Sequence, residues 1–335
     1  MGSSANSDPP PGAAFAAAFR ERAGPGGTLR FDEFGALALY DPAVGYYRRE
    51  RPRVGRGPGT DFFTAASVGT LFGELVAAAC HDLLAGRPAA DFTFVEIGAE
   101  GAGGILEGVE HGFGAARTVR LGEPLALEGP CVVFANELFD AQPFRRWRFR
   151  AGAWRELGVR LDDAGLAEIE LGPAAHAALP ASAPEGYLLD APLAAADLAA
   201  AIAAQPWSGL LATCDYGKSW PVLCEATPGG TARAYFRHRQ SNALLAHPGE
   251  QDLTCHVCWD WIAAEFTRRG FAAAPVCSQE AFFVRHAGGR LAELAAAEAG
   301  RFSARKLALA QLLHPAHLGQ KFQVFVASRW APGSG

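Results

Sequence analysis

Hydrophobic positions along the chain form two kinds of pattern: short continuous apolar runs and longer segments with one apolar face. The clearest run is 92–97, which is aromatic and β-branched and is followed at once by glycines, as is typical of a buried strand. Runs at 131–135 and 209–214 predict two more central strands, and 119–121 predicts a weaker one. Further strands are expected in a hairpin of 147–150 with 154–160, at 282–284 and at 321–328.

Helices are predicted between these runs. Residues 31–40 place apolar side chains at 31, 34, 37 and 38 on one face, and Asp41-Pro42 ends the pattern. The other predicted helices cover 13–23, 71–84, 197–205 and 259–269. Short apolar strands alternating with helices indicate an α/β fold, a mostly parallel sheet with helices on both faces. We expect residues 1–12 to be a disordered tail and 13–90 to form an N-terminal helical region.

Composition excludes several classes of protein. The chain has 335 residues, of which 50% are hydrophobic, and a net charge of −5, which argues against a general nucleic-acid binder. No stretch reaches the roughly 18 apolar residues of a membrane span, and the first residues do not form a signal peptide. The seven scattered cysteines suggest reduced thiols and a cytoplasmic protein.

Cys255 and Cys258 have CxxC spacing, but three metal or redox interpretations fail on the flanking residues. A zinc site would need a second pair, a c-type haem would need His in place of Trp259, and a redox pair would open a helix after a strand. We therefore predict buried or half-buried thiols and no metal site.

Glycines or polar residues follow three predicted strands, where ligands bind in open α/β sheets. Gly98, Gly101 and Gly103 form an irregular glycine turn, which suits a nucleoside or is a plain strand-to-helix turn. The second strand is followed by Asn136, Glu137 and Asp140, which are either ligand contacts or helix-capping residues. The third is followed by Asp215 and Tyr216, with an ordinary turn as the alternative.

Segments that match the pattern of one known protein family extend over nearly the whole chain, from about residue 31 to 326. They are ALYDP with GYY (38–47), DFFT (61–64), LFGE (71–74), ANELFDA with Pro143, DYG (215–217), RAY with HR (233–239), and PGEQDLT with HV (248–257). In their order and joint spacing, these segments resemble the MidA family of S-adenosylmethionine-dependent methyltransferases. The mitochondrial member of that family is an arginine methyltransferase that assists respiratory complex I assembly.

The resemblance implies a Rossmann-like methyltransferase domain over 91–330, with the hairpin inserted and a substrate-covering segment at about 220–260. It implies S-adenosylmethionine as cofactor and a protein substrate or partner, such as a respiratory-complex subunit; a homodimer is a further expectation. Glu137 or Asp140 could hold a guanidinium group bidentately. The implied site residues are Asn136, Glu137 and Asp140 for catalysis; Glu96, Gly98, Gly101, Glu123, Asp61 and Thr64 for the cofactor; and Tyr46, Tyr47, Asp215, Tyr216, His238, Gln251 and His256 for the substrate.

The sequence departs from the family pattern in ways that bear on the cofactor. Glu100 stands where a second glycine is expected. The family segment T-S-P-E ends here in Ser67 in place of the glutamate, and Cys258 stands in place of the aspartate that usually follows H-V. Only 40 positions separate Glu96 from Asn136, so one strand-helix unit is expected to be missing. That unit normally supplies the ribose-binding acid, a role that Glu123 could take.

Three hypotheses therefore remain at this stage. The first is a methyltransferase acting on a protein side chain with an arginine-like nucleophile. The second is a degenerate relative that has lost the cofactor and acts as a binding or assembly factor. The third is a nucleotide-dependent oxidoreductase, which only the generic fold favours.

Overall fold

The computed structural model describes residues 11–49, 69–99, 103–300, 303–314 and 318–331. The chain folds into two compact units, each assembled from three stretches of sequence. The first unit holds 1–63, 140–195 and 218–258, and the second holds 64–139, 196–217 and 259–335. Each unit has its own sheet and its own hydrophobic core.

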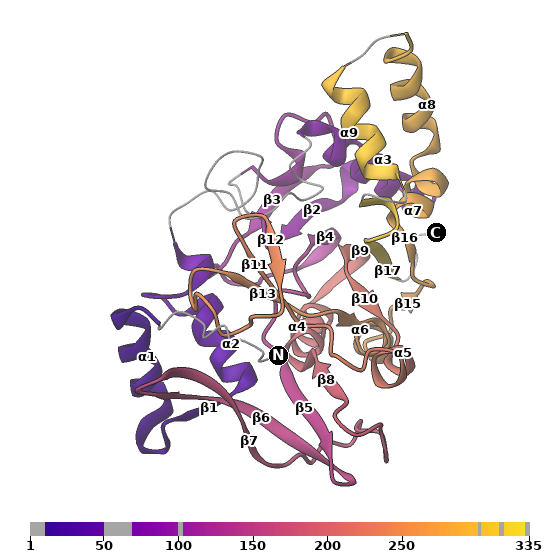
Figure 1. The fold of residues 1–335 in the computed structure, drawn as a ribbon. Helices are drawn as coiled ribbons and strands as arrows, with labels where there is room; N and C mark the ends of the chain where they lie inside the picture. The colour runs from indigo at the N-terminus through magenta and orange to yellow at the C-terminus, as the bar shows by residue number, and fades with distance from the viewer. Residues whose placement is uncertain (1–10, 50–68, 100–102, 301–302, 315–317, 332–335) are drawn as a thin grey trace. The chain divides into compact units, whose positions relative to one another are not determined.

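The second unit is built on a seven-stranded sheet (Figure 1). Its strand order is β15-β17-β9-β4-β2-β3, and β16 also pairs with β17. Four central strands are parallel, whereas β17 runs antiparallel to β9. The bounds are β2 (Thr93–Ile97), β3 (Ala115–Val119), β4 (Gly129–Asn136), β9 (Trp207–Asp215), β15 (Ala272–Ala273), β16 (Cys277–Ser278) and β17 (Gln323–Arg329). The predicted α/β fold with a mostly parallel sheet is confirmed.

Helices cover both faces of this sheet because successive strand side chains point to opposite sides. On one face, Phe72 of α3 (Thr70–Leu83) packs edge-to-face on Phe134 of β4 and on Phe283 of α7 (Gln279–His286). On the other face, Phe266 of α6 (Trp259–Arg268) packs against Phe325 of β17. Helix α4 (Leu193–Ala204) precedes β9, as predicted.

The predicted strand at 282–284 is wrong, since these residues lie in α7. Ser278 caps the helix by accepting a hydrogen bond from the Ala281 N–H at 3.2 Å, and the helix then buries Phe282 and Phe283 together. A three-residue apolar run cannot distinguish a strand from a turn of buried helix. Two further helices, α8 (Gly288–Ala297) and α9 (Ala304–Leu313), follow that the pattern did not reveal.

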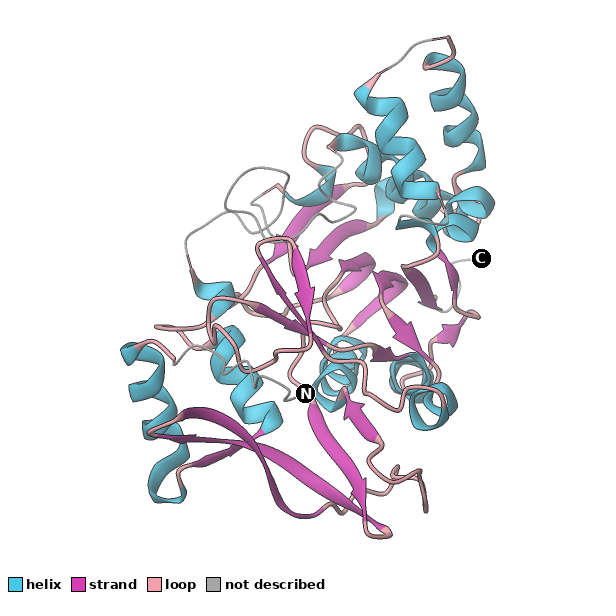
Figure 2. Cartoon of the chain, in the orientation of Figure 1, coloured by secondary structure: helices cyan, strands magenta, loops and turns pink. Residues whose placement is uncertain are grey.

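The expected shortening between β2 and β4 is present in the structure. Residues 98–99 and 103–128 contain strand β3 and one short 3-10 helix (Gly104–Leu106), but no α-helix (Figure 2). The carboxyl end of β3 is joined to β4 by residues 120–128 alone. The edge of the parallel sheet at β3 thus lacks a strand-helix unit, as the spacing predicted.

The first unit contains a five-stranded antiparallel sheet of order β1-β6-β5-β8, with β7 paired to β6. The predicted hairpin at 147–160 is confirmed as β5 and β6. The same unit holds a three-stranded ribbon of order β12-β11-β13 and two N-terminal helices. The bounds are α1 (Ala13–Ala23), β1 (Thr28–Arg30), α2 (Phe31–Tyr40), β5 (Arg145–Arg150), β6 (Ala153–Asp162), β7 (Gly165–Pro173), β8 (Leu188–Ala191), α5 (Trp220–Glu225), β11 (Arg233–Phe236), β12 (Arg239–Ser241) and β13 (Asp252–Thr254).

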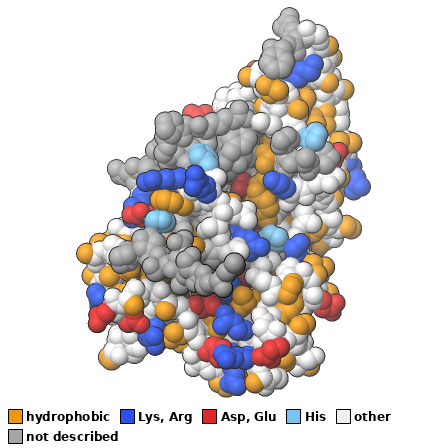
Figure 3. Space-filling view, viewed as in Figure 1, with side chains coloured by type: hydrophobic (Ala, Val, Ile, Leu, Met, Phe, Trp, Pro, Cys, Tyr) orange, Lys and Arg blue, Asp and Glu red, His pale blue; other side chains and the backbone are white. Residues whose placement is uncertain are grey.

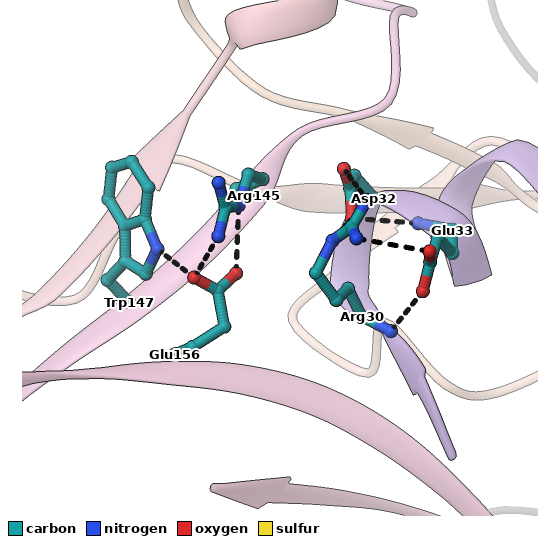
Figure 4. Close-up of polar contacts among 6 residues, drawn as sticks. All are labelled: Arg30, Asp32, Glu33, Arg145, Trp147 and Glu156. Carbon is teal, nitrogen blue, oxygen red and sulfur yellow. Dashed lines mark hydrogen bonds and ion pairs between the residues drawn. The ribbon is translucent and has the colours of Figure 1, made fainter. Parts of the chain in front are cut away.

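Charged side chains form two groups of polar contacts in this unit, one around buried Glu156 on the antiparallel sheet and one around Arg30 before α2 (Figure 4). The Glu156 carboxylate on β6 accepts hydrogen bonds from the Trp147 indole and from Arg145, whose Nε lies 3.0 Å away. At the end of β1, the Arg30 guanidinium pairs with Asp32 at 3.0 Å. The Arg30 backbone N–H donates to the Glu33 side chain, and this bond caps the N-terminus of α2. Because the Glu156 side chain is only 8% exposed, Trp147 and Arg145 depend on its carboxylate as their hydrogen-bond acceptor.

None of the seven cysteines forms a disulfide, and Cys255 and Cys258 are each 1% exposed, which confirms the prediction of buried thiols for that pair. No helix within the described ranges is long and apolar enough to cross a bilayer. Figure 3 shows Lys and Arg side chains interspersed with Asp and Glu over the coloured part of the surface.

Replacing Glu156 with alanine should strand a buried indole N–H and a guanidinium, and should destabilise the protein by about 3 kcal/mol. Urea denaturation followed by circular dichroism measures this change. The matched control is Glu170→Ala, which removes the partner of Arg150, a residue 63% exposed, and should change stability by less than about 1 kcal/mol. Equal effects of the two substitutions would contradict the assigned role.

Candidate functional site

Four parallel strands of the second unit end at the same edge of its sheet, and this edge gathers many of the predicted site residues. The register places Ile97 of β2 opposite Ala135 of β4 and Val119 of β3, and Asn136 opposite Cys214 of β9. Parallel pairing therefore brings the segments that begin at 98, 120, 136 and 215 together.

Gly98 lies where only glycine fits without strain. Its φ is +83°, and a Cβ built on it would lie 2.8 Å from Cδ1 of Leu138. Its N–H donates to the Val119 carbonyl at 2.8 Å. The turns that follow β2 and β4 are thus in van der Waals contact, and the Gly98 backbone remains exposed beside this contact.

Glu96 is buried and supports the glycine turn. Its Oε2 accepts the Ile105 N–H at 2.6 Å, and a Cβ on Gly104 would collide with the same oxygen. Burial raises the pKa of Glu96, and the hydrogen bond from Ile105 counteracts part of that rise. The geometry assigns Glu96 to holding residues 104–105.

Asn136 and Glu137 form an unusual pair at the end of β4. Glu137 has a φ of +51°, a left-handed conformation that is uncommon for a residue with a side chain. Its carboxylate accepts the Asn136 amide N–H at 3.0 Å. Because a carboxylate can only accept, this bond fixes the amide orientation. Asn136 Oδ1 is then buried with no hydrogen-bond partner among the described residues.

Asp215 is fully buried and joins two strand ends. Its Oδ2 accepts the Phe139 N–H at 2.9 Å and its Oδ1 accepts the Tyr216 N–H at 2.8 Å. The Glu137 N–H donates to the Cys214 carbonyl at 2.9 Å, which reinforces the same junction. These contacts make Asp215 a positioning residue for the 136–139 turn. Tyr216 packs its ring on Phe322, with centroids 4.2 Å apart.

Glu123 lies in the loop after β3, beside the carboxyl edge. Its carboxylate accepts the Arg120 backbone N–H at 2.7 Å and pairs with the Arg120 guanidinium at 3.1 Å. These bonds lower the pKa of Glu123. The carboxylate is therefore ionised at neutral pH and retains lone pairs to accept from hydroxyl groups.

The first unit carries the other predicted residues, several of them in an aromatic cluster with buried carboxylates. Tyr47 donates to Asp252 Oδ1 at 2.9 Å, and its ring stacks on Tyr40 and meets Tyr46 edge-on. Burial, followed by the Asp252 charge, raises the pKa of both Tyr40 and Tyr47. These phenols therefore remain protonated hydrogen-bond donors. Tyr40 donates to the Ala141 carbonyl at 2.9 Å.

Asp140, Gln251 and His238 have different surroundings within this unit. Asp140 is buried, and its carbonyl oxygen accepts the Cys255 N–H at 3.0 Å. The Gln251 amide donates to the carbonyls of Ala243 and Leu244. These bonds hold the loop that precedes Gln251 in the chain. His238 is exposed at the tip of the β11–β12 hairpin with a φ of +63°.

His256 follows β13, and its N–H donates to Thr231 Oγ1 at 3.2 Å. Burial lowers the pKa of His256 to about 4, and the charges of Lys218 and Arg233 act in the same direction. The imidazole is therefore neutral at pH 7. Its buried Nδ1 has no hydrogen-bond partner in the part of the chain that the structure describes.

Three predicted cofactor residues, Gly101, Asp61 and Thr64, lie outside the described residues, as does Glu100. Sequence reasoning also missed one buried pair, Arg146 with Asp190, 3.2 Å apart. Asp190 Oδ2 accepts the N–H groups of Thr231 and Ala232 at 2.7 and 2.8 Å, so it positions the start of β11. Arg146 lies in β5, whereas the sequence pattern predicted a strand that begins only at 147. The pattern therefore did not predict that Arg146 is buried.

Comparisons with known proteins agree with this architecture. Residues 117–274 match a family described as "putative S-adenosyl-L-methionine-dependent methyltransferase". A COG1565 superfamily member from Burkholderia thailandensis, crystallised with S-adenosyl-homocysteine bound, is 27% identical. The alignment covers 96% of this chain and 95% of that one, with a TM-score of 0.82. A native COG1565 superfamily structure from the same organism is 25% identical over the same shares, with a TM-score of 0.79.

Among curated proteins, none matches the chain. The family match and the two structures support the methyltransferase family for this chain, and its sheet is of the methyltransferase type.

The neutral state of His256 predicts an acid-sensitive fold. An unfolded histidine has a pKa near 6.5, so between about pH 6.5 and 4 the unfolded chain binds the extra proton. The contribution of His256 to the free energy of unfolding is therefore fully present above pH 6.5 and falls as the pH drops through that window. His256→Gln should flatten this part of the pH profile in urea denaturation. Parallel profiles for wild type and His256→Gln would contradict the prediction.

Proposed function

We propose that the chain is an S-adenosylmethionine-dependent methyltransferase. The observation that carries the proposal is the likeness, over nearly the full length of both chains, to the Burkholderia thailandensis protein that binds S-adenosyl-homocysteine. That molecule is what S-adenosylmethionine becomes once its methyl group is transferred. The family match over 117–274 points to the same reaction.

The residues at the carboxyl edge of the second unit suit such a cofactor. Gly98 offers exposed backbone where a Cβ would meet Leu138, and Glu96 and Gly104 hold the turn beside it. Exposed glycine backbone lets a nucleoside approach closely. The ionised Glu123 would accept hydrogen bonds from ribose hydroxyls. We propose Gly98 and Glu123 as cofactor contacts within the described chain, and Glu96 as the residue that holds the neighbouring turn for the cofactor.

When bound, the cofactor supplies an electrophilic sulfonium methyl group. The protein must hold a nucleophile in line with that methyl group and stabilise its charge. Asn136 Oδ1 is an uncharged acceptor without a partner, so it can take an N–H from an incoming nitrogen nucleophile. Glu137 fixes the Asn136 amide, and Asp215 fixes the turn that carries both.

We further propose a protein side chain as methyl acceptor, with an arginine-like nucleophile, as the MidA resemblance implies. A single carboxylate can bind a guanidinium bidentately, and Glu137 or Asp140 is the candidate for that role. A respiratory-complex subunit is the partner that the same resemblance suggests. A cytoplasmic location fits the seven cysteines, none of which forms a disulfide.

Cofactor binding is tested by calorimetry with S-adenosyl-homocysteine on the full chain. We expect saturable binding, and we expect Gly98→Val to weaken it at least roughly tenfold because the new side chain fills the turn. Gly86→Val is the matched control, since Gly86 has a φ of +86° but no atom within 4 Å of its Cβ position. It carries the same backbone strain without the contact and should bind as the wild type does.

Absence of binding by the wild-type protein at millimolar ligand would overturn the proposal. The shortened segment between β2 and β4 would then favour a non-catalytic binding or assembly protein. Equal losses in the two glycine variants would refute the assigned cofactor position, though not the activity.

Asn136→Ala should separate binding from transfer. We expect S-adenosyl-homocysteine to bind within about threefold of wild type, while methyl transfer falls roughly a hundredfold for loss of one positioned polar group. Label from methyl-tritiated S-adenosylmethionine, followed into lysate protein and then into methylated amino acids by hydrolysis, measures transfer. Label in methylarginine is the expected product. Undiminished transfer by Asn136→Ala would exclude Asn136 from the reaction.

A further inference from the structure

Three basic side chains of the first unit are brought together by strand pairing. Arg233 on β11 pairs with Thr254 on β13, and His256 follows Thr254 by two residues, just past the end of that strand. The His256 N–H donates to Thr231 Oγ1, which ties His256 to the residue two positions before Arg233. Lys218 ends β10 (Gly217–Lys218), which pairs with β14 (Val257–Cys258) directly after His256.

None of these three side chains forms an ion pair with a carboxylate in the part of the chain that the structure describes. Arg233 donates from Nη1 to the carbonyls of Ala232 and Gly230. These bonds fix the orientation of the guanidinium, and they do not involve its Nε and Nη2. Asp190 reaches the same stretch, but its oxygens are taken by Arg146 and by two backbone N–H groups.

The charged groups that act on the His256 ring are thus Lys218 and Arg233, both cationic. Both are half-buried, where screening by water is reduced. A buried ring nitrogen without a partner also carries a desolvation penalty. An anion placed among the three groups would remove both unfavourable features, because it pairs with the cations and accepts from a protonated imidazole.

We infer that Lys218, Arg233 and His256 form a binding site for an oxyanion, the phosphate or carboxylate group of a small molecule or substrate. The site lies wholly within the first unit and does not rest on the proposed methyltransferase activity. Protonated His256 would donate to the oxyanion, while Lys218 supplies a point charge and Arg233 a planar fork of N–H donors.

The inference is tested by proton NMR of the imidazole resonances on the full chain, without any methyl donor. His256→Gln assigns the His256 signal. Inorganic phosphate and acetate are titrated separately against chloride at matched ionic strength. We expect a saturable shift of the His256 signal and a rise of its pKa by about one unit or more at saturation. A response to both ions indicates a general oxyanion site, and a response to one identifies the preferred group.

Lys218→Met and Arg233→Met should each weaken the apparent affinity about tenfold, for loss of one charge-assisted contact. Lys306→Met, an exposed lysine on α9, is the matched control and should bind as the wild type does. The folding of each variant is checked by its remaining histidine signals. The inference fails if neither ion moves the His256 signal beyond chloride, or if the Lys218→Met, Arg233→Met double variant binds as tightly as the control.

Discussion

The parallel pairing of β2, β4 and β9 is the constraint on which the candidate site of the second unit depends. Because these strands are parallel, their carboxyl ends meet at one edge, and the segments that follow them have to share a small space. Gly98 accommodates Leu138 there, and Glu137 takes a left-handed backbone conformation. The strain at Glu137 is sustained because its N–H bonds to Cys214 and because Asp215 holds the rest of the turn.

Three buried carboxylates in this protein hold its own backbone. Glu96, Asp215 and Asp190 each accept main-chain N–H groups from turns that have no regular secondary structure to satisfy them. A carboxylate accepts such bonds strongly, and it therefore fixes a turn more firmly than a neutral side chain would. An acidic residue after a strand is consequently ambiguous in sequence, and here the contacts distinguish Asp215, a positioning residue, from the exposed, ionised Glu123.

The two units differ in the polar groups that define their candidate sites. In the second unit the group is an amide oxygen, Asn136 Oδ1, which can only accept a hydrogen bond. In the first unit it is an imidazole nitrogen of His256 beside two cations. An acceptor calls for a donor such as an amine or guanidine, whereas a cationic cluster calls for an anion. Each unit therefore suits a different kind of ligand group, and the two sites can be tested independently.

Local sequence patterns determined much of the fold. The strands at 92–97, 131–135 and 209–214 and the helix at 31–40 follow from apolar runs and periodicity, and the spacing of Glu96 and Asn136 predicted the missing strand-helix unit. These features depend on residues close together in the chain. Only the tertiary structure decided that 282–284 is helical, since burial of both Phe282 and Phe283 comes from distant elements. It likewise decided which polar residues hold turns and which lack a partner, because a hydrogen bond between residues 139 and 215, or between 190 and 231, depends on chain crossings that no local pattern encodes.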